Sequence, residues 1–342
     1  MPEDRNTTLY YRTGKLPQAD LLRFLANCHF SDPRIILGPG LGHDAAVVDL
    51  GDRYLATKSD PITFATDEIG WYVVHINTND IACVGAIPRW FIATLLLPAE
   101  KTTPALAEQV FEQLCTACAE VGATLIGGHT EITHGLDRPI AIGMMLGEIA
   151  PGRLIRSNGA RPGDRLLLTK GIAIEGCAIL ARELASQLRL QIPAAVLSRA
   201  AAFLHDPGIS VLREAQILAS LEGIHAMHDP TEGGVATGIY ELAQAAGCGA
   251  HIERSALPIL PETALLCELL HLDPLGLISS GSLLAAIAPD ALASALDALQ
   301  AAGIPAVEIG WVTEASGVFL RDGASVMPLP QFARDELARL FD

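Results

Sequence analysis

The feature that most constrains this chain is a polar quartet inside a segment that otherwise reads as an apolar helix. The pattern over 71–85 predicts a helix, with Pro88 just beyond its end. Inside it, Asn77-Thr78-Asn79-Asp80 stands between Ile76 and Ile81. Burial of such side chains without partners is costly, so the quartet is either solvated helix surface or part of a polar site. We favour the polar site.

Four further segments place an acid or a hydroxyl group beside glycines or at the end of an expected strand. They are 38–46 (with Gly40, Gly42, His43 and Asp44), 58–61 (with Asp60), 125–131 (with Gly127, Gly128, His129 and Thr130) and 227–234 (with His228 and Asp229). Glycines let backbone amides crowd around an anion, and the amides of the helix expected after 227–234 are suited to a phosphate. Taken singly, each segment is as well explained by a tight turn, or at Asp60 by an Asx-turn before Pro61.

The acids of these segments suggest a cation if the fold brings them together. Asp44, Asp60, Asp80 and Asp229 have an unperturbed pKa of about 3.9 and are ionised at neutral pH. Two such charges about 4 Å apart repel by about 4 kcal/mol at an effective dielectric constant of roughly 20. Oxygen ligands favour Mg²⁺, which commonly bridges carboxylates to phosphates. Carboxylate-held magnesium beside Gly-rich loops is therefore an arrangement suited to a nucleoside triphosphate.

Length and patterning predict two domains of mixed α/β (α+β) architecture. The chain has 342 residues, and the Pro/Gly-rich stretch 151–164 separates two halves in which strands and helices alternate. We place the domains at 1–155 and 156–342. Within them, the pattern predicts a helix with Thr103 as its N-cap and Pro104 as its first residue, a strand over 123–126 that opens into the di-glycine loop, and a helix over 175–188.

Composition excludes several classes of protein. A formal net charge of −16 argues against a partner such as nucleic acid or an anionic membrane, since both require a basic face. No apolar run approaches the length of a membrane span, and the N-terminus lacks the apolar region of a signal peptide. Seven scattered cysteines indicate a reduced, cytoplasmic protein rather than a disulfide scaffold.

The ordered motifs resemble a known superfamily. Gly40-Leu41-Gly42-His43-Asp44-Ala45-Ala46-Val47, Ser59-Asp60, Asn79-Asp80-Ile81-Ala82-Cys83-Val84-Gly85-Ala86 and Gly127-Gly128-His129-Thr130 resemble the successive nucleotide-site motifs of the aminoimidazole ribonucleotide (AIR) synthase-related, or PurM-like, ATP-binding proteins. These include AIR synthase, selenophosphate synthetase, thiamine monophosphate kinase and the HypE hydrogenase-maturation factor. The segment His228-Asp229-Pro230-Thr231-Glu232-Gly233-Gly234 and the segment Leu272-Asp273-Pro274-Leu275 are most similar to HypE.

The resemblance implies a two-lobed fold whose N-terminal lobes pair in a homodimer, with ATP and Mg²⁺ beside the Gly-rich loop. By position, the metal-binding residues are Asp44, Asp60 and Asp80, and the nucleotide-contacting residues are Gly40, Gly42, Asn79, Gly127, Gly128 and Thr130. Asp229, His43 and His129 are the candidates for catalytic roles, because imidazole can contact phosphate or exchange a proton near a pH of about 6.5.

The sequence also departs from the family pattern. HypE dehydrates a carbamoyl group on a terminal cysteine, whereas the last cysteine here is Cys267. His43 and His129 stand where family members usually carry acids, and imidazole is a poor magnesium ligand. Glu131 replaces a lysine typical of HypE, and Ser280 replaces the acid of its Asn-Glu-Gly segment.

These observations predict a magnesium-dependent, ATP-binding enzyme that activates an oxygen of a small or peptide-borne substrate by phosphoryl transfer, with dehydration as a variant. Two alternatives stay open: a nucleotide-binding scaffold with weakened catalysis, and a small-molecule kinase similar to thiamine monophosphate kinase. Lys15 either folds over the site or is a solvated residue of the N-terminal segment.

Overall fold

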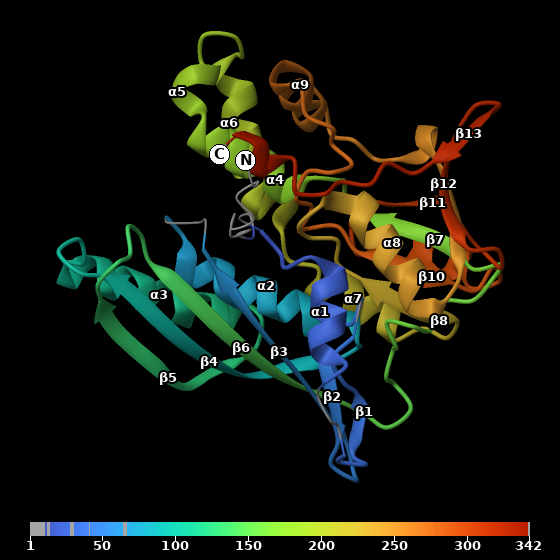
Figure 1. Cartoon of the computed structure of the whole chain (residues 1–342), viewed down its shortest axis with the longest axis horizontal. Helices are drawn as coiled ribbons and strands as arrows, with labels where there is room; N and C mark the ends of the chain where they lie inside the picture. The colour runs from blue at the N-terminus through green and yellow to red at the C-terminus, as the bar shows by residue number, and fades with distance from the viewer. Residues whose placement is uncertain (1–10, 12–13, 28–30, 41, 64–66, 341–342) are drawn as a thin grey trace, which may run out of the picture.

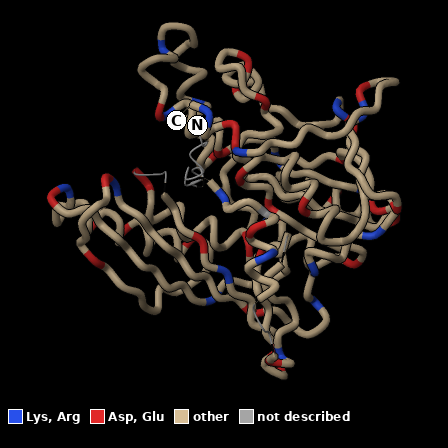
Figure 2. The backbone as a smooth tube through the Cα atoms, viewed as in Figure 1, with Lys and Arg blue, Asp and Glu red and all other residues tan. Residues whose placement is uncertain are grey.

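The chain is a mixed α/β protein built on two sheets, and its structure is a computed structural model (Figure 1). Residues 11, 14–27, 31–40, 42–63 and 67–340 are described, so Leu41 of the Gly-rich loop lies outside the described residues. The expected two-lobed α/β architecture is confirmed. Lysine and arginine are scattered over both lobes among the more numerous acids (Figure 2). None of the described helices is long and apolar enough to cross a membrane.

The N-terminal lobe is a six-stranded sheet in the order β1-β2-β3-β6-β4-β5. Its strands are β1 (Ile35–Leu37), β2 (Ala46–Asp49), β3 (Tyr54–Ile62), β4 (Ile87–Pro98), β5 (Thr124–Thr133) and β6 (Ile140–Ile149). Its helices are α1 (Gln18–Leu25), α2 (Ile69–Cys83) and α3 (Pro104–Glu120). The start of α3 is as predicted, because the Thr103 hydroxyl accepts the amide of Leu106 and Pro104 takes the first helical position.

The di-glycine segment departs from expectation. It was expected to be a loop after a strand that ends at Ile126, but β5 continues through it and pairs in parallel with β4. A bulge beside Ile92 shifts the register before the glycines. At Gly128, φ is +149°, and an added Cβ would lie 1.8 Å from the carbonyl oxygen of Ala93. A side chain at this position would collide with β4, so the glycine is what allows β5 to pair this closely with β4.

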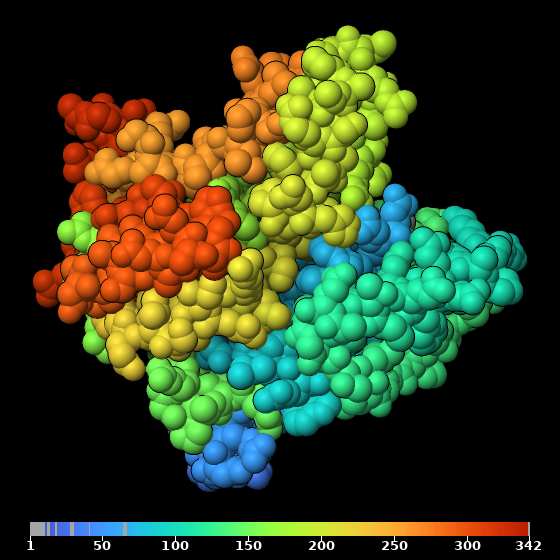
Figure 3. Space-filling view, turned by 180° about the vertical axis from the view of Figure 1, so that it is seen from behind, coloured from blue at the N-terminus to red at the C-terminus, as the bar shows by residue number. Residues whose placement is uncertain are grey.

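The C-terminal lobe is a seven-stranded sheet in the order β13-β12-β9-β11-β7-β10-β8. Its strands are β7 (Arg165–Thr169), β8 (Ile224–His228), β9 (Gly249–Glu253), β10 (Leu284–Ile287), β11 (Ala306–Thr313), β12 (Gly317–Asp322) and β13 (Ser325–Pro328). Its helices are α4 (Ile174–Glu183), α5 (Ala185–Leu188), α6 (Ala194–Ala202), α7 (Leu212–Ala219), α8 (Gly234–Ala246), α9 (Pro261–Leu270) and α10 (Leu292–Ala301), with short turns η1 (Leu204–Gly208), η2 (Arg254–Ala256) and η3 (Leu337–Leu340). The single helix expected over 175–188 is divided at Leu184 into α4 and α5. Seen from behind, α5, α6 and α9 project above the two lobes (Figure 3).

Helix α2 lies between the lobes, and every one of its residues is buried. It packs on β3 and β6 of its own sheet and on α7 and β8 of the other lobe. The polar quartet is therefore buried and not solvated. Asn77 accepts the amide of Asp60 at 2.7 Å, and the Thr78 hydroxyl donates to the carbonyl of Val74 at 2.7 Å.

Asn79 joins the two lobes. Its side-chain amide donates to the carbonyl of Ile209 at 2.8 Å, and its side-chain oxygen accepts the amide of Val211 at 2.9 Å. Both partners belong to the segment that leads into α7, and Asn79 itself has no exposed surface. The side chain thus fixes the C-terminal lobe on α2.

We expect Asn79→Ala to lower the free energy of unfolding by about 2–4 kcal/mol, since it leaves a buried carbonyl and a buried amide without partners. Urea denaturation measures the loss. Thr78→Ala is the matched control, because its hydroxyl bonds only within α2, and we expect it to cost about 1 kcal/mol. Equal effects of the two substitutions would contradict the role of Asn79 at the junction.

Candidate functional site

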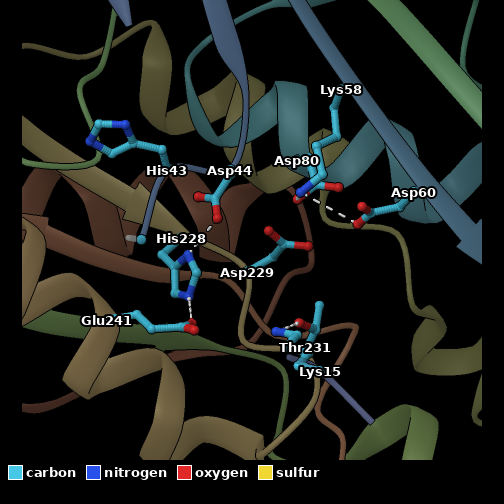
Figure 4. A pocket seen from close by; sticks show the side chains of 11 residues that line it. Lys15, His43, Asp44, Lys58, Asp60, Asp80, His228, Asp229, Thr231 and Glu241 are labelled. Atoms are coloured by element: carbon cyan, nitrogen blue, oxygen red, sulfur yellow. Dashed lines mark hydrogen bonds and ion pairs between the residues drawn. The ribbon is translucent and has the colours of Figure 1, made fainter. Parts of the chain in front are cut away.

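Acidic side chains from both lobes converge on one pocket of about 180 Å³ (Figure 4). Its lining residues are Lys15, Gly42, His43, Asp44, Lys58, Asp60, Asp80, His228, Asp229, Thr231 and Glu241. Strand β3 and helix α2 supply one wall, and the end of β8, the connection that follows it and Glu241 of α8 supply another. The condition on which the cation hypothesis depended is therefore met, because all four aspartates line this pocket.

His228 bridges two acids from different elements. Its Nδ1 lies 2.8 Å from Asp44 Oδ1, and its Nε2 lies 3.1 Å from Glu241 Oε2. Burial by itself would lower the pKa of His228, but the charges and hydrogen bonds of Asp44 and Glu241 outweigh burial and raise the pKa well above 6.5. The two acids therefore favour the protonated imidazole, whose charge would neutralise part of the acidic cluster.

Lys58 bridges the other two acids. Its Nζ lies 3.1 Å from Asp80 Oδ1 and 3.4 Å from Asp60 Oδ2. Asn77 fixes this stretch of β3, because its side chain bonds both the amide and the carbonyl of Asp60. Burial raises the pKa of the Asp80 carboxyl well above its usual value, and the nearby Lys58 charge opposes that rise. Asp60 lies within β3, and not at the strand end expected from the sequence.

Asp44, Asp80 and Asp229 each keep one carboxylate oxygen that is buried and without a hydrogen-bond partner. Their exposed fractions are only 6, 5 and 2%. Burial raises the pKa of Asp229 to about 7, and the Asp44 charge adds to the rise. Ligand atoms of Asp44, His228 and Asp229 all lie within 4.8 Å of one another. A group at this spacing in which both aspartates keep an unpaired buried oxygen fits a hard divalent cation such as Mg²⁺.

The Gly-rich loop sets the position of His43 and Asp44. Gly42 has a φ of +67°, and an added Cβ there would lie 2.8 Å from the carbonyl oxygen of Glu241. This close contact places the loop against α8. His43 lines the pocket with its Nδ1 2.9 Å from the carbonyl oxygen of Gly38, and a Cβ at Gly40 would lie 2.8 Å from its ring.

Lys15 lies at the pocket, on the side opposite the aspartates in Figure 4. Its Nζ is 3.5 Å from the Thr231 hydroxyl, and its amide donates to Glu232 at 3.2 Å. Of the two interpretations open from the sequence, the one that folds Lys15 over the site agrees with these contacts.

The remaining sequence-predicted residues lie elsewhere. The side chain of Asn79 is occupied by the backbone of the C-terminal lobe. Gly127, Gly128, His129 and Thr130 are exposed on the edge strand β5, where His129 lies 3.6 Å from Glu131. One row of the sheet runs from Asp60 through Gly143 and Ala93 to Gly128. Three strand spacings separate its ends by roughly 14 Å.

Comparisons with known proteins place this geometry in a family. The N-terminal domain profile of AIR synthase-related proteins matches residues 42–149, and the C-terminal domain profile matches residues 161–323. The carbamoyl dehydratase HypE of Rhodobacter capsulatus is 31% identical over 304 residues, which cover 87% of this chain and 86% of the relative. The chain belongs to the AIR synthase-related family.

Solved structures agree with this membership. A crystal structure of the hydrogenase maturation protein HypE in complex with ATP has a TM-score of 0.72 at 25% identity, and the match covers 93% of this chain and 96% of that one. Thiamine monophosphate kinase from Aquifex aeolicus shares the fold, with a TM-score of 0.69 at 20% identity over 93% of this chain and 100% of that one.

Two cations and one acid of the pocket in this AIR synthase-related chain were not predicted from the sequence. Sequence reasoning did not assign Lys58, His228 or Glu241 to the site, although Lys58 lies two residues from Asp60 and His228 precedes Asp229. In a strand, residues two apart share a face, so the pairing of Lys58 with Asp60 could have been predicted. Glu241 carries no comparable signal, because its contact depends on how α8 lies against the Gly-rich loop.

The start of α8 holds a carboxylate from the same chain. The amide of Gly233 donates to Asp335 Oδ2 at 2.7 Å. The sequence predicted that backbone amides at the start of this helix bind a phosphate. For Gly233 this prediction is wrong, because its amide already donates to Asp335. Burial raises the pKa of Asp335 to about 6. No sequence pattern links two residues this far apart.

Glu175 is a second buried acid behind this segment. Its amide donates to the carbonyl of Ser280, and the neighbouring Ser279 amide donates to the carbonyl of pocket residue Thr231. Burial raises the pKa of Glu175 to about 7; the nearby Ser280 hydroxyl opposes this rise, and the charge of Asp335 adds to it. One carboxylate oxygen of Glu175 has no hydrogen-bond partner.

We expect Glu175 to make stability fall as pH rises. The pKa of Glu175 is higher in the folded state than in the unfolded state, so the protonated carboxyl group favours folding. Its contribution to the free energy of unfolding is complete below about pH 4.5 and is lost as the pH rises through about 7. Glu175→Gln should therefore gain about 2–3 kcal/mol relative to wild type between pH 5 and pH 8, as measured by urea denaturation. The exposed Glu222→Gln is the control. A pH-independent difference for Glu175→Gln would contradict the assigned shift.

Proposed function

We propose that this chain is an ATP- and Mg²⁺-dependent enzyme of the HypE type. In this proposal it transfers a phosphoryl group to an oxygen of a small or peptide-borne carbonyl or amide substrate. The observation that carries the proposal is the set of three partnerless, buried carboxylate oxygens of Asp44, Asp80 and Asp229 in one pocket. The HypE relatives, one of them solved with ATP, support the choice of nucleotide.

The charges of the pocket support a single divalent cation. Five carboxylates line it, and the chain itself provides the cations Lys15, Lys58 and His228. With all five acids ionised, two negative charges remain before a nucleotide binds, and one Mg²⁺ would neutralise them. Asp44 and Asp229 would hold the ion, which would neutralise charge that develops on the transferred phosphoryl group.

The remaining groups have separable tasks. Lys15 and the Thr231 hydroxyl face the metal-binding acids and are placed to bind phosphate oxygens or the acceptor oxygen. His43 stands at the loop with one ring nitrogen held by the carbonyl of Gly38, so its other nitrogen is available for a hydrogen bond to the substrate. Such positioning of the reactants is the main contribution a protein makes to phosphoryl transfer.

The second part of the proposal is a homodimer formed by the N-terminal sheet. Helices α2 and α3 cover one face of this sheet, and the opposite face points away from the rest of the molecule (Figure 1). By strand register that open face carries Ile87, Trp90, Ile92, Leu96, Ile142, Met144 and Leu146. Ile87 and Trp90 are 48% and 38% exposed. A continuous apolar sheet face of this kind is suited to a second copy.

The nucleotide contacts expected at β5 fit the same assembly. Gly127 to Thr130 are exposed, and Gly128 lies roughly 14 Å from Asp60 across three strand spacings of one sheet. We infer that β5 of a second copy supplies these contacts. The dimer would then be required for tight nucleotide binding, and not only for stability.

The metal part is tested by calorimetric titration of a non-hydrolysable ATP analogue with and without Mg²⁺. We expect binding that Mg²⁺ strengthens, and we expect Asp44→Asn to weaken binding at least tenfold in Mg²⁺, since it removes one charged ligand. Asp52→Asn, at an exposed residue, is the control. Binding with no dependence on Mg²⁺ would overturn the metal assignment, and Mg²⁺-dependent binding without turnover of any candidate substrate would favour the scaffold alternative.

The dimer part is tested by Met144→Glu, which places a charge on the open face of the sheet. We expect sedimentation analysis to show a dimer for wild type and a monomer for this variant, and nucleotide affinity to fall at least tenfold. Leu190→Glu is the matched control, because Leu190 is 90% exposed on the distant α5–α6 connection. A monomeric wild type that binds the nucleotide tightly would contradict the assembly.

A further inference from the structure

The acids of the pocket form two separate pairs. Asp44 and Asp229 belong to the group whose ligand atoms lie within 4.8 Å of one another. Asp60 and Asp80 come together around Lys58, whose Nζ lies 3.4 Å from one and 3.1 Å from the other (Figure 4). Enzymes that transfer phosphoryl groups often place a metal ion in each of two such positions.

Lys58 is held in place by the fold. Lys58 and Asp60 lie two residues apart on β3, so both side chains point to the face that α2 covers. Asn77 fixes the backbone of Asp60 through two hydrogen bonds, and Asp80 lies one turn further along α2. The side chains of Lys58 and Asp80 are only 24% and 7% exposed. The ammonium group is therefore confined between the two carboxylates.

The charge of the pocket agrees with this arrangement. Lys58 already offsets one of the two negative charges of Asp60 and Asp80, so a second ion between these acids would have to share the space with an ammonium group. Repulsion between an ammonium group and a divalent ion a few ångströms apart disfavours the presence of both.

We propose that Lys58 is a resident cation that takes the place of a second metal ion between Asp60 and Asp80, so that each chain binds one divalent cation with its nucleotide. This inference rests on the proposed function and assigns its metal stoichiometry. It changes the expected role of Asp60 from metal ligand to partner of Lys58.

The test counts ions directly. Mn²⁺, a paramagnetic substitute for Mg²⁺, is titrated into the full chain with the non-hydrolysable ATP analogue, and free Mn²⁺ is measured by electron paramagnetic resonance. We expect one bound ion per chain for wild type and for Lys58→Arg, and two for Lys58→Met. Lys101→Met is the matched control, because Lys101 forms an exposed pair with Asp137 at 3.3 Å, and it should bind one ion.

A second measurement covers the case in which Lys58→Met folds poorly. Removal of Lys58 leaves two acids unpaired, so we expect this variant to melt below wild type without metal and to gain more than wild type when Mg²⁺ is added. Two ions on wild type would overturn the role of Lys58, as would one ion on a folded Lys58→Met. Absence of Mn²⁺ binding to wild type would instead overturn the proposed function.

Discussion

The complete burial of α2 is the constraint on which the rest of the structure depends. A helix with Asn77, Thr78, Asn79 and Asp80 in its middle can lie between two lobes only if every one of these side chains is paired. Asn77 and Asp80 pair with Asp60 and Lys58 of β3, Thr78 pairs within the helix, and Asn79 pairs with the C-terminal lobe. Of these four side chains, Asp80 keeps one oxygen without a partner, and this oxygen faces the pocket. The hydrogen bonds that make burial possible therefore also fix the sheet, the lobes and the site relative to one another.

Charge compensation is the second requirement, and the chain meets most of it internally. Asp44, Asp80 and Asp229 are buried enough that water does little to screen them, so protonation, an internal cation or a bound ion must neutralise them. His228 bridges Asp44 and Glu241, and Lys58 bridges Asp60 and Asp80, so each cation offsets part of the charge of its pair. Three carboxylate oxygens of this pocket stay buried and unpaired, those of Asp44, Asp80 and Asp229. They limit the positions at which a metal ion can bind.

The sequence was sufficient for the parts of the structure that depend on local pattern. The helix containing Asn79 and the capped start of α3 follow from periodicity and capping. The convergence of the four aspartates does not follow from local pattern, and only the resemblance to the family implied it. The rest depends on contacts between distant segments. Asp335 reaches Gly233, Glu241 reaches His228, and β5 continues past its glycines because β4 pairs with it. Pattern within one segment carries no information about such partners.

The two faces of the N-terminal sheet therefore have different tasks. Because α2 covers one face and connects it to the C-terminal lobe, the site can form only there. The other face keeps apolar side chains such as Ile92 and Leu96 partly exposed, and these side chains need no hydrogen-bond partners when they are buried. Strand β5 lies at the edge where the two faces meet, and its glycines are exposed. A second copy on the open face would bring assembly and nucleotide binding together at that edge.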